Sequence, residues 1–174
     1  MDLLVLMIAV SLSMDAFSLS LAYAMAGITK KQIITLALTV GIFHFFMPLL
    51  GMTFGFFILK KFAFNYSFLV FLILFFVGIQ MILESFKEKE VKPLKTIEII
   101  LFALAVSIDS FSVGITLTDI NENYIVSALI FSIISFIFTL FGLVLGNKIA
   151  KMIGKVSTFI GGVILMVIGI IYLF

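Results

Sequence analysis

The chain has 174 residues, of which 64% are hydrophobic and 11% charged, whereas a soluble domain is roughly half apolar and a quarter charged. With a mean hydropathy of +1.39, it is not an ordinary soluble globular protein. The net charge of +2 comes from 11 lysines, no arginine, nine acidic residues and one histidine. This composition gives no basic surface for nucleic acid. The absence of cysteine excludes disulfides and thiolate metal ligands.

Polar residues, glycine and proline divide the apolar sequence into six predicted membrane-crossing helices. A bilayer core of roughly 30 Å takes about 20 apolar residues per helix. On this basis the crossings lie near residues 3–25, 33–58, 66–85, 97–117, 124–146 and 157–174. Strands are disfavoured, because lipid tolerates them only in closed barrels and these runs are too long for barrel strands. We therefore expect an all-α integral membrane protein, a single transmembrane domain over residues 1–174 that has the lipid bilayer as a partner.

The distribution of lysine predicts the orientation. Nine lysines fall on one side of the predicted bundle and two on the other, and the lysine-rich side is expected to be cytoplasmic. Both termini would then lie outside, with residues 87–95 as a cytoplasmic linker, in a bacterial cytoplasmic membrane. The nine lysines are Lys30, Lys31, Lys87, Lys89, Lys92, Lys95, Lys148, Lys151 and Lys155, and the other two are Lys60 and Lys61.

A cleaved signal peptide is an alternative for the first crossing, since Ala22-Tyr23-Ala24 fits the small-residue rule for cleavage. It is disfavoured because signal peptides begin with basic residues, and the first lysine here is Lys30.

The sequence contains an internal repeat. Residues 13–20 (SMDAFSLS) match residues 107–114 (SIDSFSVG) at four of eight positions. Six small or polar residues of the second crossing, at 37, 41, 44, 48, 51 and 55, recur 91 positions later in the fifth. We expect one repeat over about residues 1–86 and another over about 96–174. Because each repeat has three crossings, the second would be inverted, and transporters of this type place their ion sites where the repeats meet.

Asp15 and Asp109 occupy matching positions of the repeat, about halfway along their crossings. An intramembrane charge costs about 2.5 to 3.5 kcal/mol on insertion scales, so it marks a functional site by default. The two aspartates are the main candidate metal ligands. The alternative is that each merely hydrogen-bonds a neighbouring helix.

Further candidate ligands lie on the same helical faces or beside them: Ser11, Met14, Ser18, His44, Ser112 and Thr116. Hydroxyl oxygens could replace water around a cation, although serine and threonine also bond back to their own helix. His44 precedes Pro48 by one turn and could ligate a metal or relay a proton, or be a packed histidine. Gln80 and Glu84 carry weaker signals, for which packing and a solvated helix end are the favoured interpretations.

Carboxylate, hydroxyl and carbonyl oxygens suit Mg²⁺, Ca²⁺ and Mn²⁺, and an imidazole favours Mn²⁺ or another transition ion. We therefore expect a divalent cation as substrate. No catalytic residue and no cofactor are expected, because the protein is predicted to be a transporter and not an enzyme.

Three segments carry a family resemblance: Ser-Met-Asp-Ala-Phe-Ser at 13–18, Met-Pro-Leu-Leu-Gly at 47–51 and Ser-Ile-Asp-Ser-Phe-Ser-Val-Gly at 107–114. They resemble the MntP family of small bacterial manganese efflux pumps and, more distantly, the lysine-exporter superfamily. The resemblance covers essentially the whole chain. It implies Mn²⁺ export across the cytoplasmic membrane, with Asp15 and Asp109 as the transport aspartates. His44 departs from the Glu or Gln of other members, and a sporulation-associated branch shares the aspartate motifs.

The expected mechanism is H⁺ antiport by alternating access, because moving a divalent ion outward against the membrane potential costs about 4.6 kcal/mol per 100 mV. Three alternatives stay open. An amino-acid exporter would need a cationic group at mid-depth, and none is present. An intramembrane aspartyl protease would need a Gly-x-Gly-Asp motif, which is absent here. The third is a structural or assembly protein, and the glycine stripes would also permit a homo-oligomer.

Overall fold

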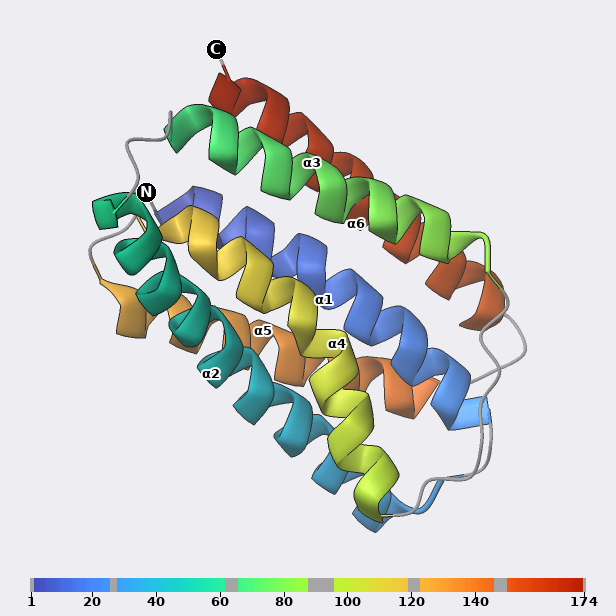
Figure 1. Cartoon of the computed structure of the whole chain (residues 1–174). Helices are drawn as coiled ribbons and strands as arrows, with labels where there is room; N and C mark the ends of the chain where they lie inside the picture. Colours follow the sequence, from blue (N-terminus) through green and yellow to red (C-terminus); the bar gives the residue numbers. More distant parts are fainter. Residues whose placement is uncertain are drawn as a thin grey trace.

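The computed structural model describes residues 2–25, 28–61, 66–87, 96–118, 123–145 and 150–173. These residues form six α-helices (Figure 1): α1 (Asp2–Met25), α2 (Lys30–Lys61), α3 (Tyr66–Ser85), α4 (Thr96–Leu117), α5 (Tyr124–Leu145) and α6 (Ala150–Leu173). All six are long and apolar enough to cross a membrane. The predicted all-α class with six crossings is confirmed. The predicted linker lies outside the described residues, except for Lys87.

Two predicted helix starts were wrong, because hydropathy marks the membrane core and not the helix end. α2 begins at Lys30 instead of residue 33, because Thr29 and Gln32 form a capping box. The Thr29 N–H donates to Gln32 Oε1 at 2.9 Å, and the Gln32 N–H donates to Thr29 Oγ1 at 3.3 Å. α6 begins at Ala150 instead of residue 157, so its first turns contain lysines that precede most of the apolar run.

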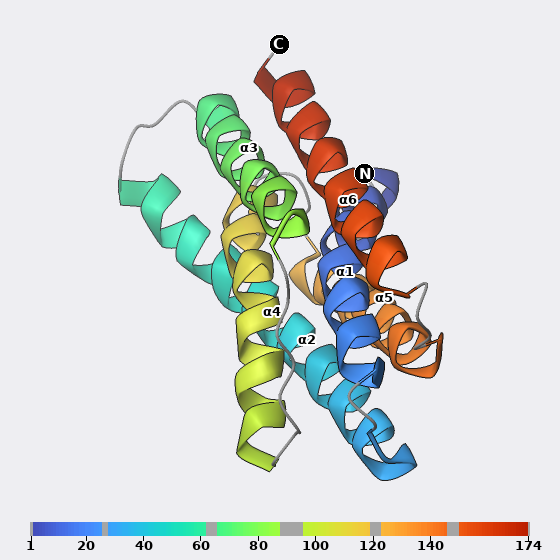
Figure 2. The same cartoon turned by 90° about the vertical axis from the view of Figure 1, so that its right-hand side faces the viewer.

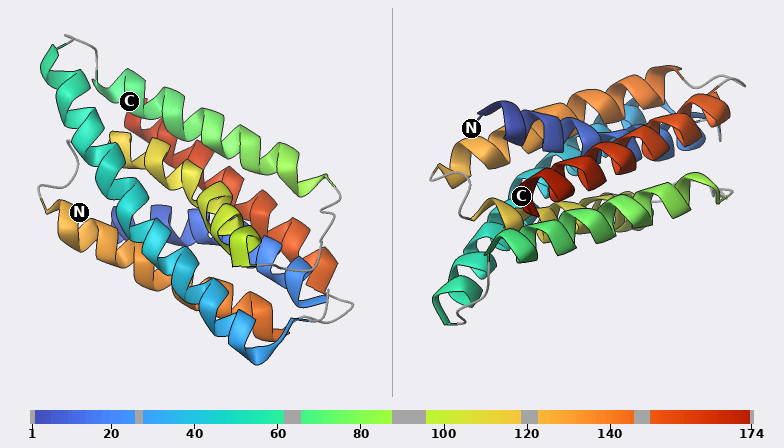
Figure 3. Two further views of the ribbon diagram at one scale, coloured as in Figure 1. Left: turned by 60° about the horizontal axis from the view of Figure 1, so that its bottom comes forward. Right: turned by 90° about the horizontal axis from the view of Figure 1, so that it is seen from above.

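The helices form two flanks with two further helices between them. In Figure 1, α3 and α6 lie side by side along one flank, α2 and α5 lie along the opposite flank, and α1 and α4 run between them. Figure 2 shows α4 beside α2, and α1 beside α5 and α6. Both panels of Figure 3 show α3 and α6 running in opposite directions. α1 is thus packed into the bundle, on α5 and α6.

Glycines bring the backbones of neighbouring helices together. A Cβ built on Gly142 of α5 would lie 2.7 Å from the carbonyl oxygen of Phe17 in α1. A Cβ on Gly51 of α2 would overlap the carbonyl oxygen of Phe111 in α4. These contacts join equivalent positions of the two sequence repeats, and they show that glycines among the small residues shared by the second and fifth crossings serve close packing. The inverted-repeat arrangement itself stays a prediction, which these paired contacts support.

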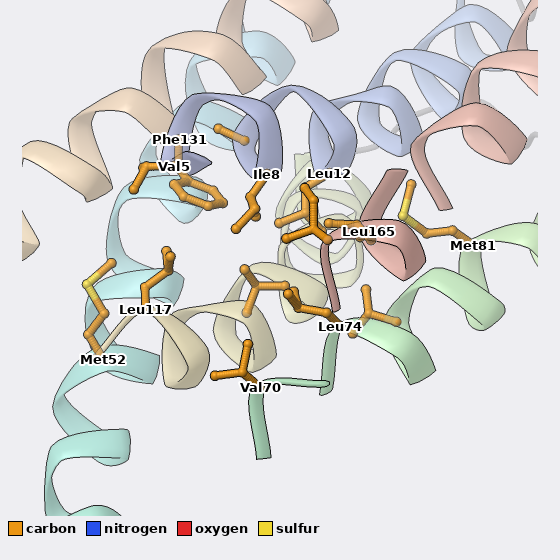
Figure 4. Packing of buried hydrophobic residues seen from close by; sticks show 14 residues of the cluster. Val5, Ile8, Leu12, Met52, Val70, Leu74, Met81, Leu117, Phe131 and Leu165 are labelled. Carbon is orange, nitrogen blue, oxygen red and sulfur yellow. The ribbon is translucent and has the colours of Figure 1, made fainter. Parts of the chain in front are cut away.

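The buried apolar core is small compared with the apolar surface. Figure 4 shows one cluster, in which Ile8 of α1, Leu74 of α3 and Phe131 of α5 are fully buried. Large side chains such as Phe46 and Phe141 are more than half exposed. In water such surfaces would be an aggregation hazard, so this exterior fits a lipid environment.

Candidate metal centre

The two predicted aspartates lie on α1 and α4, two helices that contact each other only sparsely. Asp15 of α1 and Asp109 of α4 are half-buried and lie within electrostatic range of each other. α1 touches α4 only sparsely, and so does α3, whereas α2 packs along α4 and α5 packs along α1. Two like charges repel and lose hydration when they are buried. The loose junction of α1, α3 and α4 therefore accommodates them better than a tight helix interface would.

α3 contributes to this junction a polar side chain for which packing was the favoured interpretation of the sequence. Gln80 Nε2 donates to Asp109 Oδ1 at 3.3 Å and to Glu84 Oε1 at 3.3 Å. Glu84 also lies within electrostatic range of Asp109. The available signal was the spacing: Gln80 and Glu84 are four residues apart on an otherwise apolar helix, so they share one face.

His44 is fully buried in α2, and Asp15 lies within electrostatic range of its ring. Nδ1 is 3.0 Å from the carbonyl oxygen of Val40. Because a carbonyl only accepts, Nδ1 carries the proton, and Nε2 presents a lone pair. Nε2 has no hydrogen-bond partner among the described residues. Pro48 has no N–H to donate to the backbone carbonyl of His44 one turn earlier. His44 therefore offers two acceptor atoms, its Nε2 and its carbonyl oxygen.

The predicted hydroxyl ligands are placed less favourably. Ser11 donates to the carbonyl oxygen of Met7 at 2.8 Å, and Thr116 donates to that of Val113 at 2.7 Å. Both thus make the bonds to their own helix that were the alternative interpretation.

Ser18 and Met14 lie on the face of α1 that packs on α6: Ser18 is beside Gly154 and Met14 beside Gly161. Ser112 is half-buried on α4.

Several further buried hydroxyls are present. Ser13 and Ser135 are 2.8 Å apart and link α1 to α5. The hydroxyl oxygens of Ser110, Thr139 and Thr158 are buried without a partner among the described residues. In the same part of the chain, no three His, Asp or Glu side chains come close enough together to hold a metal ion. The centre is therefore a pair of carboxylates with an imidazole nearby and not a preformed metal cage.

Six apolar helices around an intramembrane pair of carboxylates define a multi-pass membrane protein with a polar centre. The protein family described as "Putative manganese efflux pump" matches residues 27–173. A protein of Bacillus pumilus (strain SAFR-032) is 39% identical over 169 residues, which cover 95% of this chain and 91% of the relative. One of Geobacillus thermodenitrificans (strain NG80-2) is 35% identical over 170 residues, covering 97% and 93%.

Both relatives are named "Putative manganese efflux pump MntP". The chain belongs to this family, which confirms the resemblance found in the sequence, and it is a multi-pass bacterial membrane protein. No solved structure matches it.

Proposed function

We propose that this protein exports Mn²⁺ from the cytoplasm and that Asp15 and Asp109 bind the ion during transport. The observation that carries the proposal is the pair of carboxylates, which come from equivalent repeat positions and lie within electrostatic range of each other. Family membership supports the choice of ion. The predicted orientation, with both termini outside, belongs to the same proposal.

The donor atoms near the carboxylates suit Mn²⁺. Carboxylate oxygen is a hard ligand, and the His44 Nε2 lone pair adds a nitrogen that Mn²⁺ accepts more readily than Ca²⁺ or Mg²⁺ does. A bound cation would offset the repulsion between Asp15 and Asp109 and draw the two side chains together. The His44 carbonyl and water would complete the coordination. In this scheme the hydroxyls of Ser11 and Thr116 keep their helical hydrogen bonds.

Proton coupling follows from the charge on the ion. Export of Mn²⁺ against an inside-negative potential costs about 4.6 kcal/mol per 100 mV. If Asp15 and Asp109 each take up an outside proton as the metal leaves, two H⁺ enter per Mn²⁺ and the cycle is electroneutral. In vesicles, proton flux should then oppose Mn²⁺ flux. A Mn²⁺ flux that is indifferent to an imposed proton gradient would contradict antiport while leaving export intact.

Alternating access is supported by one asymmetry in the packing. α6 packs along α1, but α3 touches α4 only sparsely, although these are equivalent helix pairs of the predicted repeats. In transporters with inverted repeats, the two repeats exchange conformations to open the site to opposite sides. In this proposal the described structure is one of two such states, with the junction of α3 and α4 as the loose side.

The test is cell manganese and growth in a manganese-sensitive bacterium that expresses this chain. We expect the native protein to lower cell manganese and restore growth, and either Asp15→Asn or Asp109→Asn to abolish both effects at equal membrane abundance. Thr39→Val is a matched control, because Thr39 is only partly buried and its hydroxyl donates to the Thr35 carbonyl of its own helix. Unchanged manganese with the native protein would refute Mn²⁺ export, and activity that survives both aspartate substitutions would refute the site.

A further inference from the structure

The end of α3 carries a polar pair that leads toward the carboxylate centre. Glu84 lies in the last turn of α3, one turn from Gln80, and the amide nitrogen of Gln80 contacts both Glu84 and Asp109. One small group therefore bridges a carboxylate near the helix end and a carboxylate at mid-membrane. Lys87 follows two residues after the helix ends, on the side that the lysine pattern predicts to be cytoplasmic.

This arrangement is found on one side of the molecule only. With the repeat offset of 91 positions, the residue equivalent to Gln80 is Ile171 of α6. The side chain of Ile171 is 67% exposed. The glutamine was thus not imposed by the repeat, since the equivalent position carries an isoleucine. The polar pair also lies at the contact between α3 and α4, which is sparse. The equivalent helices of the other repeat, α6 and α1, pack closely.

Two further polar atoms, one on α2 and one on α4, point to a ligand. His44 Nε2 and Ser110 Oγ are both fully buried and without a partner among the described residues. Asp15 lies within electrostatic range of both the His44 ring and Asp109. Unsatisfied polar atoms in a buried site are costly unless something binds them. A hydrated or partly hydrated cation meets this requirement.

We infer that Glu84 and Gln80 form the cytoplasmic approach to the site, in which Glu84 captures the divalent cation and Gln80 hands it to Asp109. This inference rests on the proposed function and adds a capture step to it. Without a cation, the Gln80 amide nitrogen holds the two carboxylates together. With a cation, the same amide can rotate to present its oxygen, which is a hard ligand for Mn²⁺ and Mg²⁺. Glu84 raises the local cation concentration at the mouth of the path.

The test is Mn²⁺ transport by the full-length protein in vesicles of known orientation. The chain has no cysteine. A Lys87→Cys background labelled with an impermeant maleimide therefore shows on which side of the membrane α3 ends. We expect Glu84→Gln to raise the KM for Mn²⁺ by about tenfold, the lower end of the effects known for residues that support metal ligands. The rise should appear only when Mn²⁺ is presented on the Lys87 side, with the maximal rate within about twofold. Glu84→Asp should restore most of the loss.

Glu98→Gln is the matched control. Glu98 is a carboxylate at the start of α4, near the same end of the bundle, with Tyr23 of α1 within electrostatic range. Its loss should leave the KM unchanged, and an equal rise for both variants would mean general surface attraction and overturn the capture role. If Glu84→Gln does not reach the membrane, Gln80→Leu makes the same comparison.

The remaining outcomes separate the two proposals. A Glu84→Gln variant with native KM, beside an inactive Asp109→Asn variant, overturns the inference and leaves Mn²⁺ export standing. A native protein that transports no Mn²⁺ overturns both.

Discussion

α5 meets the backbone of α1 at Gly142, and this contact allows a stability prediction to be worked out from the structure. A Cβ added at Gly142 would lie 2.7 Å from both the Phe17 carbonyl oxygen and the Ser20 Cβ. Nonbonded carbon atoms prefer about 3.5 to 4.0 Å. Because the oxygen belongs to the backbone of a helix, no change of rotamer relieves the overlap. In Gly142→Ala, α5 must instead move away from α1 by about 1 Å.

The expected loss of stability is moderate. Overpacking of this kind costs about 1 to 3 kcal/mol, and alanine recovers up to about 1 kcal/mol through its helix propensity. Because the overlapped atom is a helix backbone oxygen, the upper half of that range, about 2 to 3 kcal/mol, applies, and the net loss for Gly142→Ala is about 1 to 2 kcal/mol. For a chain of this length, each kcal/mol lowers the unfolding midpoint by about 2 to 4 °C, so the midpoint should fall by about 2 to 8 °C.

The assay is thermal unfolding of purified protein in one detergent, followed by circular dichroism. Gly169→Ala is the matched control, since its nearest neighbours would lie at 3.2 to 3.4 Å from the added Cβ, and its midpoint should move by less than about 2 °C. The reasoning is refuted if Gly142→Ala unfolds at the wild-type temperature, or if both variants lose the same stability.

Three further changes test other contacts by the same unfolding measurement. Thr29→Ala removes the cap of α2 and should cost about 1 kcal/mol, whereas Thr39→Ala, at a partly exposed site inside the helix, should not. Ser13→Ala and Ser135→Ala should be coupled by about 0.6 kcal/mol in a double-mutant cycle, the average for hydrogen bonds between membrane helices; additive effects would contradict the 2.8 Å bond. Thr158→Val removes a buried hydroxyl that has no described partner and should raise stability by about 1 kcal/mol, so a loss would show that the hydroxyl is in use.

The helices and the aspartate pair could be predicted because both depend on the cost of polarity in lipid. Apolar runs of about 20 residues must form helices in lipid, because only a helix satisfies its own backbone hydrogen bonds there. A mid-membrane carboxylate is easily recognised in a sequence with so few charges. The starts of α2 and α6 could not be placed from hydropathy. The start of α2 is set by the hydrogen bonds of the capping box of Thr29 and Gln32. An average of hydropathy contains no information on such bonds.

The sequence drew attention to Gln80 and Glu84 of α3, but it favoured packing and a solvated helix end over a role at the centre. Glutamine and glutamate near the end of an apolar helix are equally compatible with a solvated end, and only the position of α3 in the bundle brings Gln80 to Asp109. The serine and threonine candidates show the opposite case. Ser11 and Thr116 lie on the predicted faces, but a hydroxyl on a helix can always bond to a carbonyl of the preceding turn, so their position alone did not define their role.

The two kinds of contact in this bundle bear differently on movement. Where glycine brings backbone against backbone, as at Gly142 on α1 and Gly51 on α4, one helix cannot slide along the other without forcing Cα and carbonyl atoms together, because packed interiors do not deform continuously. The junction of α3 and α4 has sparse contacts, and a single glutamine amide connects them at Asp109. Replacing the hydrogen bond between Gln80 and Asp109 by a contact to water or to a cation costs little net free energy. Under the proposed function, movement between states should therefore be concentrated where α3 meets α4, next to the carboxylate that binds the ion, while the glycine-packed pairs move as rigid units.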